Sequence, residues 1–203
     1  LGRMDGDGLT LAVDHFGDPS GPPVVLLHGG GQTRHAWGGA GRVFAGAGRH
    51  AMSFDLRGHG DSDWSPSGSY MLDDFASDVR SIVAALDETP VLVGASLGGL
   101  ASIVAVGENP TEAHGIARAI VLVDVAPRIE FEGRVKIQEF MRAGMRGFDT
   151  LDDAADAVAS FNPNRPRPRD VSGLRKNLRE RGDGRWYWHW DPAFLTKPNE
   201  DPF

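Results

Sequence analysis

Short apolar runs recur along the first 127 residues and are separated by amphipathic or small-residue stretches. Leu9, Leu11 and Val13 alternate with polar or small neighbours, which predicts a strand with one buried face. Four later runs show little alternation, as parallel strands do when both faces of the sheet are covered. These runs cover residues 24–27, 51–54, 91–93 and 119–123.

Two stretches between these runs have the helical period. Apolar residues recur on one helix face at Phe75, Val79, Ile82, Val83 and Leu86. Residues 98–106 are mostly small, which suits a helix that lies against a sheet. Strands that alternate with helices predict an α/β fold, with a mostly parallel sheet flanked by helices.

The pattern changes after Pro127, beyond which we find no further run of the core-strand type. The spacing predicts a helix over 137–148, a second helix that opens at a capping box formed by Thr150 and Asp153, an extended proline-rich connector over 162–168 and a short helix over 171–178. We therefore expect two units. Residues 1–127 form a core, and residues 128–203 form a helical lid over the carboxyl edge of the sheet.

A motif typical of serine nucleophiles lies between a predicted strand and a predicted helix. Gly94-Ala95-Ser96-Leu97-Gly98 matches G-x-S-x-G, and this context is the one in which the motif presents a serine at the carboxyl edge of a sheet. The turn would hold Ser96 in a strained backbone conformation. The flanking glycines let strand and helix pack closely.

Two further loops follow strands that end at the same edge of the sheet. They are His28-Gly29-Gly30-Gly31-Gln32-Thr33 and Asp55-Leu56-Arg57-Gly58-His59-Gly60-Asp61-Ser62. Together with the serine motif, their order resembles the α/β-hydrolase superfamily over residues 9–127, in particular lidded serine hydrolases of the esterase, enol-lactonase and cofactor-free haloperoxidase kind. The resemblance implies that Ser96 is the nucleophile, that the backbone N–H groups of Gly30 and Leu97 form the oxyanion hole, and that no cofactor or metal takes part.

Four titratable or charged residues in these loops have structural interpretations. In the family, the histidine of the His-Gly motif supports the oxyanion loop, and the Arg-Gly-His-Gly loop ties adjacent strands together. The resemblance therefore assigns His28 and His59 to structural support rather than to catalysis. We interpret Asp55 and Arg57 as a structural ion pair.

The resemblance also implies a general-base histidine and an acid that follow the last two core strands, and we find neither strand in the sequence. Asp124, at the end of the run 119–123, is a candidate for the acid, although a structural role is favoured. His189, in the predicted lid, is an alternative candidate for the base. A sheet that ended at 119–123 would have a bare apolar edge. We therefore expect these 203 residues to be incomplete as a catalytic unit, with a C-terminal part of the same protein supplying the rest.

Composition narrows the range of partners. The formal net charge of −7 argues against a general nucleic-acid binder, and the absence of cysteine excludes disulfides, thiolate metal sites and a cysteine nucleophile. Without a membrane-spanning run or a signal peptide, we expect a cytoplasmic enzyme with no membrane partner.

The charge is unevenly distributed along the chain. Residues 1–127 carry 7 Lys and Arg against 15 Asp and Glu, whereas residues 128–203 carry 14 against 13. This shift agrees with two structural units.

The predicted function is hydrolysis of a carboxylic ester or related small acyl substrate through a covalent acyl-enzyme. Alternatives on the same scaffold are C–C bond hydrolysis and perhydrolysis of the haloperoxidase type. A non-catalytic ligand-binding protein is the alternative from another class. The tryptophan-rich segment 185–192 would either wall an apolar acyl pocket or anchor the lid to the core.

Overall fold

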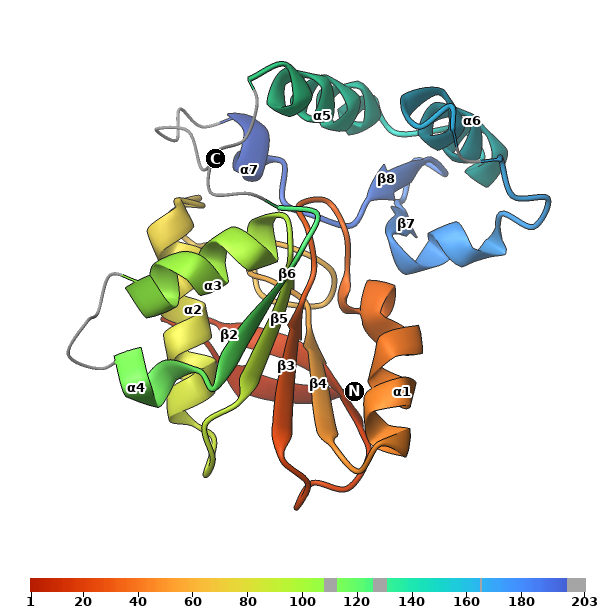
Figure 1. The fold of residues 1–203 in the computed structure, drawn as a ribbon. Coiled ribbons are helices and arrows are strands. Elements are labelled where there is room, and N and C mark those ends of the chain that lie inside the picture. The colour runs from red at the N-terminus through yellow and green to blue at the C-terminus, as the bar shows by residue number, and fades with distance from the viewer. Residues whose placement is uncertain (108–112, 126–130, 165, 197–203) are drawn as a thin grey trace.

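A six-stranded sheet forms the centre of the molecule (Figure 1). The computed structural model describes residues 1–107, 113–125, 131–164 and 166–196. The strands lie side by side in the order β1 (Gly2–Asp5), β2 (Thr10–Phe16), β4 (His50–Phe54), β3 (Pro23–Leu27), β5 (Val91–Ala95) and β6 (Ala119–Val123). The last four run parallel to one another. β2 pairs antiparallel with both of its neighbours, β1 and β4. The predicted α/β fold is confirmed, and β1 is a strand that the sequence pattern did not predict.

Helices cover both faces of this sheet. One face carries α1 (Gly38–Gly46), which follows the short helix η1 (Arg34–Trp37), and the other carries α2 (Leu72–Ala84), α3 (Leu97–Gly107) and α4 (Ala113–Ile116) (Figure 1). Successive β3 residues enter different apolar layers, because strand side chains alternate between faces. Val25 and Leu27 pack in the cluster that includes Val79 of α2, whereas Val24 and Leu26 pack near Phe44 of α1.

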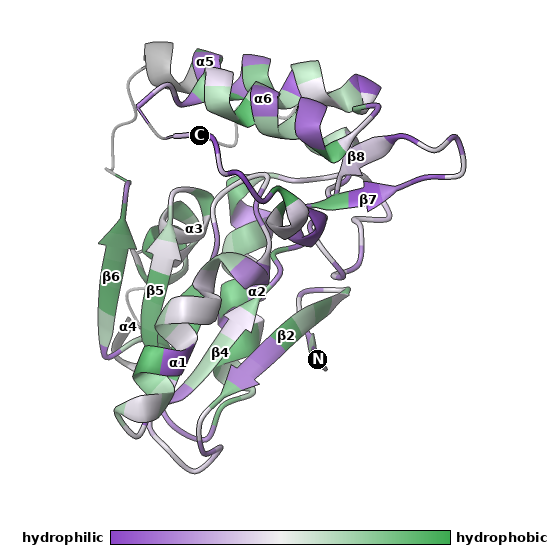
Figure 2. Ribbon diagram, turned by 90° about the vertical axis from the view of Figure 1, so that its right-hand side faces the viewer, coloured by the Kyte–Doolittle hydropathy of each residue, from purple (hydrophilic) through white to green (hydrophobic). Residues whose placement is uncertain are grey.

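The segment after β6 forms a separate layer beyond the carboxyl ends of the parallel strands (Figures 1 and 2). We call residues 131–196 the upper layer. It contains α5 (Phe131–Ala143), η2 (Gly144–Arg146), α6 (Leu151–Phe161), η3 (Ser172–Lys176), β7 (Leu178–Glu180), β8 (Trp186–Trp188) and α7 (Ala193–Thr196). The predicted boundary between residues 127 and 128 falls in 126–130, outside the described residues.

The upper layer is less helical than the sequence pattern predicted. Leu178, expected in a short helix, lies in β7 and pairs with Trp188 of β8. The aromatic residues of β8 favour a strand, and the turn at 181–184 ends in an Asp-Gly pair with Gly184 at φ 77°. The capping box of α6 formed as predicted: the Thr150 hydroxyl accepts a hydrogen bond from the Asp153 N–H at 3.1 Å, and the Asp153 carboxylate accepts one from the Thr150 N–H at 3.0 Å.

The edge strand β6 presents apolar side chains to solvent. Val121, Leu122 and Val123 are 46%, 39% and 39% exposed. β5 is the neighbour with which β6 pairs within the described structure. The described sheet therefore has the bare apolar edge that the sequence predicted.

Candidate active site

Ser96 sits at a sharp turn between β5 and α3. Its φ is +43°, in the left-handed region that non-glycine residues rarely adopt. The turn is held by a hydrogen bond from the Ser96 N–H to the Val123 carbonyl at 3.2 Å, and by one from the Leu100 N–H to the Ser96 carbonyl at 2.9 Å. This is the strained strand–turn–helix geometry that the sequence motif predicted.

Glycine at position 98 permits the close approach of α3 to β3. A Cβ atom at this position would lie 2.6 Å from the carbonyl oxygen of Leu27, a backbone atom that cannot swing away. The Gly98 N–H donates to the His28 carbonyl at 3.2 Å. The elbow and the glycine-rich loop after β3 are thus joined through main-chain atoms.

The glycine-rich loop lies directly beside Ser96. A Cβ atom built on Gly29 would be 3.4 Å from the Ser96 Cβ, and one built on Gly30 would be 3.9 Å from Leu97 Cδ2. No described residue accepts a hydrogen bond from the backbone N–H of Gly30 or Leu97. The structure therefore brings together Ser96, Gly30 and Leu97, the three residues to which the sequence assigned nucleophile and oxyanion hole.

Two buried histidines fix this loop. His28 Nε2 accepts from the Leu56 N–H at 3.0 Å, and His59 Nε2 accepts from the Gly31 N–H at 3.0 Å. Because each Nε2 is an acceptor, each ring carries its proton on Nδ1, which lies 2.8 Å from the Gly29 carbonyl in His28 and 2.9 Å from the Arg57 carbonyl in His59. Burial lowers the pKa of His28 to about 4 and of His59 to about 3, so both are neutral supports at pH 7.

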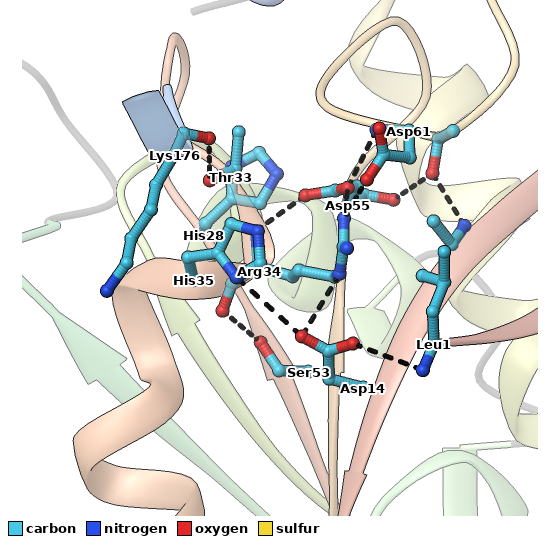
Figure 3. Close-up of polar contacts among 12 residues, drawn as sticks. Leu1, Asp14, His28, Thr33, Arg34, His35, Ser53, Asp55, Asp61 and Lys176 are labelled. Atoms are coloured by element: carbon cyan, nitrogen blue, oxygen red, sulfur yellow. Dashed lines mark hydrogen bonds and ion pairs between the residues drawn. The ribbon is translucent and has the colours of Figure 1, made fainter. Parts of the chain in front are cut away.

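Arg34 is a residue that the sequence analysis missed. It is buried and donates to the carboxylates of Asp55 and Asp61, and its Nε lies 3.1 Å from Asp14 (Figure 3). Burial opposes its charge, but these carboxylates outweigh that effect and raise the pKa of Arg34. The sequence offered one indirect signal, since Asp55 and Asp61 lie in one short loop, and two carboxylates so close together need a cation.

The predicted pairing of Asp55 with Arg57 is wrong. Asp55 is fully buried and pairs with Arg34, whereas Arg57 binds Asp78 of α2, with its Nε 2.6 Å from Asp78 Oδ2. Nearness in sequence did not decide the partners, because each side chain meets an opposite charge from a distant segment, Arg34 for Asp55 and Asp78 for Arg57. Both residues are nevertheless structural, as their complete pairing within the core shows.

The upper layer reaches the glycine-rich loop with three apolar side chains. A Cβ atom at Gly31 would lie 3.3 Å from Met141 Cε and 3.9 Å from Trp190 Nε1, and one at Gly30 would lie 3.8 Å from the Phe194 ring. Met141 and Trp190 belong to the apolar segments that the sequence singled out, whereas Phe194 was not predicted. An apolar wall thus stands over the loop.

Main-chain hydrogen bonds attach this part of the upper layer to the core. The Gly60 N–H donates to the His189 carbonyl at 2.7 Å, and the Asp191 N–H donates to the Gly58 carbonyl at 2.8 Å. The Tyr70 hydroxyl donates to the Asp191 carboxylate at 2.6 Å. The Arg-Gly-His-Gly loop is therefore the joint between the two layers.

The remaining predicted candidates, Asp124 and His189, do not complete a triad with Ser96. Asp124 directly follows β6, where Val123 is paired with Ala95, and has a φ of +52°. Its side chain is exposed and makes no hydrogen bond or ion pair with another described residue. His189 is partly buried, and burial and the charge of Arg179 lower its pKa to about 4. Neither side chain hydrogen-bonds Ser96.

The part of the chain that the structure describes holds no group of three or more histidine, aspartate or glutamate side chains placed to bind a metal. None of its helices combines the length and apolarity needed to cross a bilayer.

Comparison with known proteins identifies the family. The model of the alpha/beta hydrolase family matches residues 24–202. The chain belongs to the alpha/beta hydrolase family. Individual relatives and solved structures show which members of the family it resembles.

The curated relatives of this hydrolase include an esterase from Mycobacterium tuberculosis, 31% identical over 182 residues, which are 85% of this chain and 57% of the esterase. A 2-(acetamidomethylene)succinate hydrolase from Mesorhizobium japonicum is 31% identical over 116 residues, 57% of this chain and 40% of that protein. The chain thus spans about half the length of these relatives.

Solved structures repeat the same architecture. An alpha/beta hydrolase from Novosphingobium aromaticivorans superposes with a TM-score of 0.83 at 26% identity, over 99% of this chain and 71% of that one. The predicted membership and fold class are confirmed, and a hydrolase of this family is the function class that the relatives support.

Proposed function

We propose that the protein is a serine hydrolase that cleaves carboxylic esters or related acyl compounds. The observation that carries the proposal is the strained Ser96, held beside two backbone N–H groups that no described residue uses, those of Gly30 and Leu97. Ser96 Oγ attacks the acyl carbon, and the two N–H groups stabilise the negative charge that develops on the acyl oxygen. The alcohol leaves, and water then hydrolyses the acyl-enzyme.

The wall over the glycine-rich loop supports an acyl substrate with an apolar portion. Met141, Trp190 and Phe194 approach the loop from the upper layer, which acts as a substrate cap in this proposal. Apolar walls with a few aimed polar groups are typical of small-molecule sites. Selection among acyl groups therefore depends on the cap rather than on the elbow.

The general base comes from outside the described residues in this proposal. Both ring nitrogens of His28 and of His59 are engaged with backbone groups, so neither imidazole is free to take the Ser96 proton. A serine needs such a base for full nucleophilicity. The relatives, of which this chain spans about half, are long enough to carry it.

A fluorophosphonate probe tests the proposal on the intact protein. We expect one adduct by mass spectrometry, with Ser96 Oγ bonded to phosphorus and fluoride lost. Ser96→Ala removes the adduct. Ser102→Ala is the matched control on the same helix, because Ser102 is buried and bonded to the Gly98 carbonyl. Folded protein without an adduct at Ser96 would contradict the proposal and favour a ligand-binding role.

A further inference from the structure

The glycine-rich loop of the proposed site needs a rigidity that its own residues do not supply. Gly29, Gly30 and Gly31 are conformationally free, whereas an oxyanion donor is effective only when its N–H is held in place before the reaction. The Gln32 N–H donates to the Gly29 carbonyl at 3.1 Å, and Gly31 has a φ of 75°, as the third residue of a type II turn does. The position of the Gly30 N–H therefore depends on what fixes the ends of this turn.

Thr33 directly follows the turn, and its side chain is bound by the upper layer. Thr33 is buried and stands at the N-terminus of η1, where a threonine hydroxyl ordinarily accepts a hydrogen bond from a backbone N–H. It makes no such contact here. Instead, the Thr33 hydroxyl lies 2.8 Å from Asn177 Oδ1 and 3.1 Å from the Lys176 carbonyl (Figure 3). One end of the turn is thus fixed by a segment of the other layer.

Asn177 reaches the same loop by a second route, through its backbone. Its carbonyl accepts from the His189 N–H at 2.9 Å, and the His189 carbonyl accepts from the Gly60 N–H at 2.7 Å. Gly60 follows His59, whose Nε2 accepts from the Gly31 N–H at 3.0 Å. Two connections between the upper layer and the glycine-rich loop therefore meet at Asn177.

We propose that Asn177 is a positioning residue for the oxyanion hole, so that the upper layer sets the rate of catalysis as well as covering the site. Its Oδ1 holds Thr33, its carbonyl holds His189, and together these contacts fix the turn that carries the Gly30 N–H. The inference rests on the proposed function. A residue that only joined the two layers would contribute to stability without affecting turnover by the folded enzyme.

Amide hydrogen exchange, measured by NMR, tests the positioning without turnover. Thr33→Val keeps the shape of the side chain and removes the hydroxyl. We expect the Gly31 and Gln32 amides to exchange about fivefold faster in this variant, as the loss of one hydrogen bond provides. Asn177→Leu should have a smaller effect, because the hydroxyl keeps the Lys176 carbonyl. The double variant should exchange no faster than Thr33→Val, since both changes remove the same contact.

Hydrolysis of p-nitrophenyl acetate by the intact protein tests the consequence for catalysis. We expect Asn177→Leu to lower kcat about fivefold and to change KM less than about twofold, a smaller loss than the roughly 10²–10³-fold effect of removing an oxyanion donor. Asn177→Asp keeps an oxygen for the Thr33 hydroxyl and should restore kcat close to that of the parent protein. Asn164→Leu, the same change on the exposed connector of the upper layer, is the control and should leave kcat unchanged.

The two measurements separate this inference from the proposed function. Unchanged exchange in Thr33→Val, faster exchange with an unchanged kcat, or a kcat that Asn177→Asp does not restore would overturn the positioning role. A parent protein with neither turnover nor labelling at Ser96 would contradict the proposed function, and the exchange rates alone would then decide whether Asn177 fixes the turn. Circular dichroism melting shows that each variant is folded.

Discussion

At the scale of single residues, glycine positions decide whether the elbow can form. A methyl group on Gly98 would meet the Leu27 backbone at 2.6 Å and push α3 away from β3. We expect Gly98→Ala to lower the free energy of unfolding by about 1–3 kcal/mol, as overpacking does. Gly39→Ala on α1 is the control, because nothing lies within 4 Å of its Cβ position, and it should gain about 0.5–1 kcal/mol. Urea unfolding measures both, and equal midpoints would refute the steric argument.

The position of Ser96 on a sharp turn was predictable, whereas side-chain partners were not. The strand–turn–helix context of its glycine motif is local in the sequence, and the resemblance to the α/β-hydrolase superfamily added Gly30 and Leu97, which the structure places beside Ser96. Arg34 was missed because its carboxylate partners come from two segments, β2 and the loop after β4, that lie far from it in the sequence. The same reason explains the wrong pairing of Asp55, whose partner depends on the path of the chain in space.

At the scale of elements, long periodic segments were predicted well and short ones were not. The helical period identified α2, and the unbroken apolar runs identified β3 to β6. The hairpin of β7 and β8 was missed because each strand has three residues, too few to show alternation. Its pairing depends on the turn at 181–184 and on contacts with Phe148, which lies opposite Trp186.

The edge strand β6 supplies a prediction at the same scale. The open edge of β6 can pair with another chain, because an edge strand carries unpaired backbone groups. Its exposed apolar side chains favour such association. We expect Val121→Lys to reduce self-association of the 203-residue chain in sedimentation velocity runs. Val43→Lys, a change at a residue 73% exposed on α1, tests whether any added charge suffices. The same reduction in both variants would exclude β6 as the cause.

At the scale of the whole molecule, buried neutral histidines link stability to pH. The folded-state pKa values of His28 and His59, about 4 and about 3, lie below the usual 6.5. The unfolded chain therefore binds more protons below pH 6.5, and the stability that these residues contribute is complete above that pH and lost as the pH falls toward 4 and 3. Each histidine adds up to about 1.4 kcal/mol per pH unit to the slope.

Urea unfolding between pH 7 and pH 4 measures this slope. His59→Gln keeps an acceptor for the Gly31 N–H and removes one titrating ring, so the slope should fall by about one proton. Ser102→Ala, which changes a buried side chain that does not titrate, should leave the slope close to that of the parent protein. An unchanged slope in His59→Gln would show that its protonation is not coupled to folding.

The joint between the two layers has a consequence for engineering. Gly58, Gly60, His189 and Asp191 meet through amide and carbonyl groups, which every amino acid except proline supplies in full. The side chain at position 189 can therefore be exchanged without breaking these contacts between the two layers. This makes residue 189 a suitable first position for a saturation library of the proposed hydrolase.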